Sequence, residues 1–181
     1  VKPQNNGFNF ADIRQALELS IVYMPQLLQN SADPTPRIQL ALAALLANRA
    51  EDAPSVETER GGNAFYLQLC FHYEHVGMGM SRTALLASEM RKLGEEISDG
   101  KMRLLQMFES LGHDTQGKDS SEVIAGFLGS LGLPTRLQEL GIPESDFQLL
   151  AEEEAAEPSV DAGADRMRDV GELLEVLKEA W

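Results

Sequence analysis

The sequence has almost no cysteine and no long hydrophobic run. Cys70 is the only cysteine among 181 residues, so no disulfide can form within the chain, and a reducing compartment is expected. No apolar stretch approaches the roughly 18 to 20 residues that a membrane-spanning helix needs. The first residues, Val1 to Gly7, are polar and lack the apolar segment of a signal peptide. These absences predict a cytoplasmic protein that does not enter a membrane.

Positive charge is also scarce. The chain has 15 Lys and Arg against 29 Asp and Glu, a formal net charge of -14. Much of the negative charge lies between Glu139 and Trp181, which include 13 acidic and 3 basic residues. Nucleic acids are bound by neutralising their phosphates with Lys and Arg, and no basic run is present. An anionic membrane surface would repel the chain as well. Neither is expected as a partner.

Common catalytic motifs are missing too. Gly77-Met78-Gly79 lacks the third glycine and the preceding strand of a dinucleotide-binding fingerprint. No Gly-x-Ser-x-Gly elbow is present, so nothing supports nucleophilic hydrolysis. The chain by itself is therefore not expected to bind a dinucleotide.

What the sequence does contain is helical periodicity. From Asn9, a candidate N-cap, to Leu28, apolar residues recur three and four positions apart, and Pro25 predicts a kink or an early stop. Asp33 to Pro36 predicts the start of a second helix, whose alanine-rich, nearly apolar composition predicts a central, buried position. Further helices are expected over residues 64–75, 81–93, 98–111, 120–131, 137–140, 143–154 and 170–181.

No segment alternates with a period of two, so the sequence predicts an all-α helical bundle. We expect a polar lead-in over residues 1–8 and a single helical domain over 9–181. Within that domain, the small and polar residues 158–168 are expected to form a linker before the final helix.

Two histidines are the candidate metal ligands. His72 and His75 lie three residues apart, so on a helix they would share a face. Imidazole is a common ligand for transition metals, and the pair would be half of a site completed from another segment. The alternative is two partly exposed histidines that are hydrogen-bonded locally at a helix end. His113, after Gly112, is expected to be a solvated turn residue.

One segment carries a family likeness. Residues 131–142, LGLPTRLQELGI, resemble the LGLPTRLSELGI segment of iron-containing alcohol dehydrogenases. Weaker likenesses over residues 13–28, 37–50 and 169–181 follow in the same order as in that family. The resemblance spans almost the whole chain and implies the fold of the family's C-terminal helical domain.

The resemblance also implies partners and cofactors. In the family, an N-terminal nucleotide-binding α/β domain joins the helical domain, and a divalent metal, often iron or zinc, lies between them. The metal polarises an alcohol or aldehyde for hydride exchange with NAD(P). The helical domain supplies two histidine ligands, the second within a Pro-His-Gly motif. Here Ala64 and Met78 occupy those positions, and thioether sulfur is a poor ligand for iron or zinc. A gapped register places His75 at the second position but Gly61 at the first.

Two functions follow as hypotheses. The chain is either the helical metal and substrate side of an NAD(P)-dependent alcohol dehydrogenase, with His72 and His75 as ligands, or a non-catalytic homologue that acts as a binding or subunit-interaction module. Its partner would be a nucleotide-binding domain or a second copy of the chain. Without a nucleotide-binding domain, an apolar patch is expected to be exposed at Ala64, Phe65, Leu69 and Met78. An accidental likeness is the third possibility.

Overall fold

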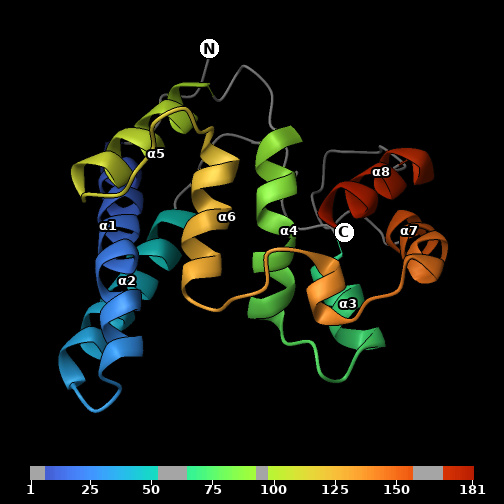
Figure 1. Cartoon of the computed structure of the whole chain (residues 1–181), viewed down its shortest axis with the longest axis horizontal. Coiled ribbons are helices and arrows are strands. Elements are labelled where there is room, and N and C mark those ends of the chain that lie inside the picture. The colour runs from blue at the N-terminus through green and yellow to red at the C-terminus, as the bar shows by residue number, and fades with distance from the viewer. Residues whose placement is uncertain (1–6, 53–64, 93–97, 157–168) are drawn as a thin grey trace. The chain divides into compact units, whose positions relative to one another are not determined.

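The computed structural model describes residues 7–52, 65–92, 98–156 and 169–181. Throughout these ranges every regular element is a helix, and none is a strand (Figure 1). The predicted all-α fold is therefore confirmed. Except for residues 7 and 8, which are helical, the predicted lead-in over 1–8 lies outside the described residues, as does the predicted linker over 158–168. No described helix is both long and apolar enough to cross a membrane.

The chain divides into two compact units. The first consists of Val1–Arg60 and Met102–Gly117, and the second of Gly61–Lys101 and Lys118–Trp181. That residues 9–181 form one domain stays a prediction.

In the first unit, α1 (Gly7–Gln29) and α2 (Pro34–Asp52) form an antiparallel hairpin. Helix α1 begins two residues before Asn9, so the predicted N-cap is wrong. The helix also continues past Pro25 for one more turn. Between the helices, the guanidinium of Arg49 donates to both carboxylate oxygens of Asp12, one at 2.6 Å from Nε. This paired hydrogen bond lowers the pKa of Asp12.

Helix α2 is not the buried central helix that its composition predicts. Its buried positions Pro36, Ala43 and Ala50 lie seven residues apart and form one narrow stripe. Ile38 and Leu45 remain 64% and 67% exposed. The reason is that α2 packs against one long neighbour, α1, and a single helix covers only one stripe of its surface. Alanine-rich composition reveals a close helix contact, not the number of neighbours.

The first unit also contains most of α5 (Ser98–Ser110). Phe108 is buried on this helix, and the ring of His113 meets it edge-on, with ring centroids 5.2 Å apart. His113 is therefore packed against an aromatic ring rather than fully solvated.

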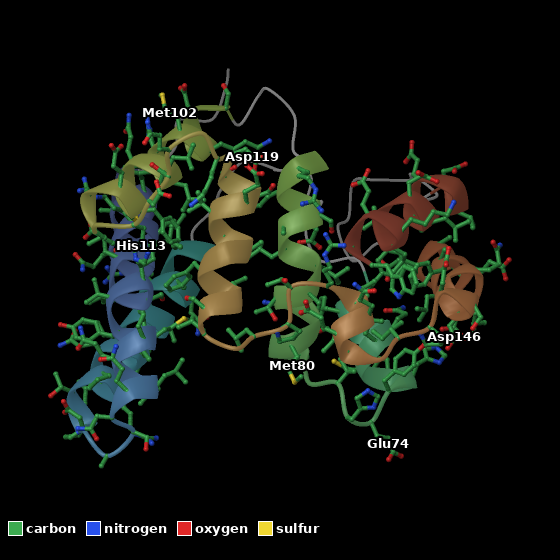
Figure 2. All side chains as sticks on the ribbon, viewed as in Figure 1. Glu74, Met80, Met102, His113, Asp119 and Asp146 are labelled. Atoms are coloured by element: carbon green, nitrogen blue, oxygen red, sulfur yellow. The ribbon has the colours of Figure 1, made fainter. Side chains whose placement is uncertain are left out.

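In the second unit, the helices surround α4 (Met78–Lys92). Helix α4 contacts α3 (Tyr66–His72), α6 (Ser120–Ser130), the 3-10 helix η2 (Leu137–Leu140) and α8 (Val170–Ala180). The 3-10 helix η3 (Glu144–Asp146) runs directly into α7 (Phe147–Ala156), which packs against α3 and α8. Helix α6 begins at Ser120, as predicted, and its N-cap is Asp119 (Figure 2), which forms a capping box with Glu122.

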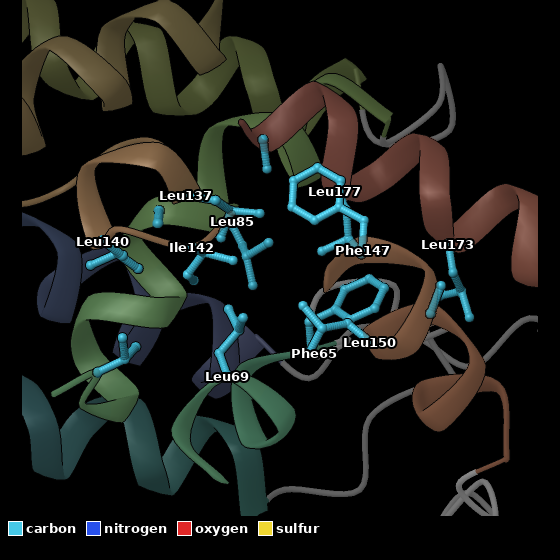
Figure 3. Close-up of a cluster of buried hydrophobic side chains, with 14 residues drawn as sticks. Phe65, Leu69, Leu85, Leu137, Leu140, Ile142, Phe147, Leu150, Leu173 and Leu177 are labelled. Atoms are coloured by element: carbon cyan, nitrogen blue, oxygen red, sulfur yellow. The ribbon is translucent and has the colours of Figure 1, made fainter. Parts of the chain in front are cut away.

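The core of this unit gathers side chains from every one of its helices except α6 and η3 (Figure 3). The segment over residues 131–142, which carries the family likeness, supplies three of these side chains. Because each buried Leu, Ile or Phe contributes roughly 1.5 to 3 kcal/mol, this segment contributes several kcal/mol to the stability of the unit. The cluster consists of Phe65, Leu69, Val76, Ala84, Leu85, Leu137, Leu140, Ile142, Phe147, Leu150, Ala151, Leu173, Leu177 and Ala180.

Candidate functional site

The candidate histidines lie at the end of α3 and in the turn that follows it. The helix begins after Phe65, whose backbone is left-handed with φ 71°. Such a conformation costs a non-glycine residue about 1 to 3 kcal/mol. It is held by the buried side chain of Phe65 and by its backbone N–H, which donates to Glu154 Oε2 at 3.2 Å. The start of α3 is thus fixed to α7 at a buried point.

The helix ends at His72, earlier than predicted. Tyr73 is extended, and its N–H donates to Leu69 O at 3.0 Å as the last helical bond. Its hydroxyl donates to Asp146 Oδ2 at 2.6 Å, which ties the turn to η3 (Figure 2). Burial raises the pKa of the Tyr73 hydroxyl, and the hydrogen bond to the Asp146 carboxylate and its negative charge raise it further. The turn is therefore a fixed part of the unit.

His72 pairs with α7. Its Nε2 contacts Glu153 Oε2, and the two side chains are 33% and 41% exposed. An ionised carboxylate only accepts hydrogen bonds, so Nε2 is the donor and carries the proton. A pair as exposed as this one is worth at most about 1 kcal/mol. It positions the imidazole without contributing much to stability.

His75 pairs with a different element. Its Nε2 donates to the carbonyl oxygen of Leu140, in η2, at 2.9 Å. Both histidines contact the ring of Tyr73, with centroids 6.4 Å and 6.1 Å from it. Since α3 ends at His72, however, the prediction that both share one helix face is wrong. Each is held by its own distant partner, and a metal could reach only Nδ1 of either ring, because both Nε2 atoms carry protons.

The described residues do not fit the family's metal site. They contain no group of three or more His, Cys, Asp or Glu side chains that could hold a metal ion. Of the two positions where the family has histidines, Ala64 lies outside the described residues. Met78 is the first residue of α4 and is 55% exposed. We therefore derive no catalytic step through a metal. Metal binding by His72 and His75 stays a prediction.

The predicted apolar patch is also mostly wrong. Phe65 and Leu69 are fully buried in the core, because α4 and α7 pack against α3. Of the described members of the patch, only Met78 is exposed. On α3 it is Leu67 and Phe71, four residues apart, that are exposed instead.

Sequence reasoning missed several groups of chemical interest in this unit. Burial raises the pKa of Glu89, on α4, to about 7, and nearby Arg82 partly opposes the shift. Gln68 is buried on α3, and Glu153 is the partner of His72. The signal for Gln68 was present in the sequence, as an amide between Leu67 and Leu69 in an apolar helix. Glu153 stands in the acidic run from Glu152 to Glu154, which by sequence is typical of a solvated helix face.

Comparison with known proteins identifies the fold. No protein-family model matches the chain, and no curated protein matches it in sequence. Among solved structures it is similar to a 1,3-propanediol oxidoreductase (21% identity, TM-score 0.73), covering 97% of this chain and 46% of that one. A putative alcohol dehydrogenase from Ralstonia eutropha JMP134 is similar at 14% identity and TM-score 0.74, with the same coverages. An alcohol dehydrogenase from Oenococcus oeni is similar at 18% identity and TM-score 0.71, with 98% and 46% covered.

The fold of this chain is that of the helical half of the iron-containing alcohol dehydrogenases. The chain matches the C-terminal half of those enzymes in structure, at low sequence identity. It spans less than half the length of the chains it matches. The predicted likeness of fold is confirmed.

Proposed function

We propose that this chain is the helical half of a two-domain protein of the iron-containing alcohol dehydrogenase type, and that its role is to bind a nucleotide-binding α/β domain. One observation carries the proposal: the match covers 97% of this chain but 46% of the matched oxidoreductase. The remaining half has no counterpart in this sequence. NAD(P) would be held by that other half, since this chain has no glycine-rich fingerprint. We expect the protein in the cytoplasm.

The role of the chain's own side chains in this proposal is packing and partner binding rather than metal chemistry. Its three histidines are His72, His75 and His113. Two have Nε2 engaged with Glu153 and Leu140, and the third packs its ring on Phe108. These contacts favour a non-catalytic subunit-interaction module over a metal-bearing half-enzyme.

The coding sequence around this chain tests the proposal. We expect a nucleotide-binding α/β domain to be encoded in frame with it or beside it. Produced together, the two should purify as a one-to-one complex that binds NAD(H) or NADP(H). If no such domain is encoded there, or if the two elute separately in gel filtration with light scattering, the proposal is wrong.

A second candidate function is oxidoreduction of a small alcohol or aldehyde with an iron or zinc ion bound by His72 and His75. One observation favours it: both rings contact Tyr73, and neither Nδ1 has a hydrogen-bond partner among the residues that the structure describes. Zinc titration followed by thermal unfolding decides it, because a ligand that binds only the folded state raises its stability. No bound metal and no thermal shift would remove this candidate.

A further inference from the structure

A small pocket lies between α3 and α7, within the second unit. Its volume is about 290 Å³, and it is lined by Gln68, Phe71, His72, Glu153 and Ala156. This is close to the lower end of the range for small-molecule sites, roughly 300 Å³. Four kinds of functional group line it: an aromatic ring, a carboxylate, a carboxamide and an imidazole.

The carboxamide of Gln68 is the group that points to a ligand. Only 7% of this residue is exposed, yet its side-chain amide has no hydrogen-bond partner among the residues that the structure describes. In this part of the chain, every buried side-chain N or O that is closed to solvent has a partner. The amide of Gln68 is therefore open to the pocket that it lines. An amide that opens into a pocket takes its hydrogen bonds there, from water or from a ligand.

Only one of the two carboxylate oxygens of Glu153 has a hydrogen-bond partner among the described residues. Its Oε2 is paired with His72, whereas Oε1 has no partner in the described part of the chain. The contact with His72 holds the carboxylate in place on α7, so that Oε1 can accept a further hydrogen bond at little cost in side-chain entropy. Glu153 thus gives the pocket a fixed negative acceptor.

Phe71 completes the set. It is the most exposed large apolar residue in the described part of the chain, at 79%. An aromatic face attracts a cation that lies within about 6 Å of the ring centre. An exposed ring beside a carboxylate is an arrangement that suits a positive group with an apolar stem.

We propose that this pocket binds an organic cation, a guanidinium or ammonium group on a short apolar stem. The stem packs on Phe71, one N–H donates to Glu153 Oε1, and another donates to the carbonyl oxygen of the Gln68 amide. The net charge of -14 favours a cation over an anion throughout. The ligand is a small free amine or an arginine or lysine side chain. This site is independent of the proposed docking of a nucleotide-binding domain.

Titration of the full chain with n-butylguanidinium, in the presence of a chelator, tests the site. By calorimetry or NMR we expect saturable binding with a Kd on the order of 1 mM, a reasonable affinity for a ligand this small. Neutral n-butanol and anionic butyrate should bind at least about tenfold more weakly, since they lack the charge-assisted hydrogen bonds. No saturation well above that concentration, or equal binding of all three probes, overturns the proposal.

Matched variants locate the site. Glu153→Gln should weaken butylguanidinium binding about tenfold, and Phe71→Ala about threefold. The controls Glu152→Gln and Leu67→Ala change an exposed neighbour on the same helix outside the pocket and should leave the Kd unchanged. If a control weakens binding as much as its partner variant, the proposal is wrong.

Gln68→Leu gives a second, independent readout. It removes the amide at nearly constant volume, and circular dichroism with thermal unfolding checks that the variant folds. Severalfold weaker binding by a folded variant is the expected result, and unchanged binding removes Gln68 from the site. A capped arginine peptide distinguishes the sources of the cation. Tighter binding than butylguanidinium supports a protein side chain, and equal or weaker binding supports a small amine.

Discussion

Replacing Leu137 by Ala tests whether the segment over residues 131–142 is structural. Leu137 is fully buried in the core of the second unit. Leu→Ala removes roughly three methylene equivalents from a dry environment, about 0.8 kcal/mol each, and leaves a cavity besides. The measured range for such substitutions is about 2 to 5 kcal/mol. We expect a loss of about 3 kcal/mol in the free energy of unfolding.

The assay uses the only tryptophan, Trp181. Its Nε1–H donates to Ile142 O at 3.2 Å, and its ring meets Phe147 edge-on. Its fluorescence therefore reports unfolding of the second unit alone, whatever the first unit does. In urea titrations, Leu137→Ala should unfold at a lower midpoint than wild type. The exposed control Gln138→Ala should keep a free energy of unfolding within about 0.5 kcal/mol of wild type. A loss below about 1 kcal/mol for Leu137→Ala, or an equal loss for Gln138→Ala, would refute the reasoning.

Three further predictions follow from single residues. Asp119→Ala should cost about 0.5 to 2 kcal/mol, since it removes the N-cap of α6. Hydrogen bonds from Ser121 and Glu122 lower the pKa of Asp119, so this contribution should be lost as pH falls through that lowered pKa, and urea midpoints at low pH check it. Burial raises the pKa of Glu89 from 4.5 to about 7. The unfolded chain therefore loses this proton at a lower pH than the folded chain does, and the free energy of unfolding should fall as pH rises from 4.5 to 7. Glu89→Gln should flatten that decline, and an unchanged pH profile would contradict it. If zinc binds, His75→Ala should weaken it more than His113→Ala in a zinc titration, and equal effects would exclude His75 as a ligand.

The sequence predicted the fold well where signals are local. The helix over residues 120–131 was predicted from its apolar spacing and from the Gly132 and Pro134 that follow it. It begins at Ser120 as predicted and ends one residue early, at Ser130. The burial of α2 was misjudged because composition does not say how many neighbours a helix has. The likeness in residues 131–142 pointed to the correct fold, since those residues pack the core that the fold requires.

The candidate site was predictable only in part. Residue types and spacing singled out His72 and His75, but their partners lie 81 and 65 residues away in the chain. The hydroxyl of Tyr73, bound to Asp146, lies in the turn where the helix has already ended. Contacts of this kind are set by tertiary packing, which no local pattern encodes.

The left-handed backbone at Phe65 limits which residues can replace it. Glycine would suit the φ of 71° but would leave a hole where a fully buried aromatic ring now sits. Other large side chains would fill the hole, and β-branched ones would fit the backbone worst. The carboxylate of Glu154 accepts a hydrogen bond from the Phe65 N–H and so helps to hold this backbone conformation. Homologues that change position 65 should therefore change position 154 as well, a covariation between the start of α3 and the end of α7.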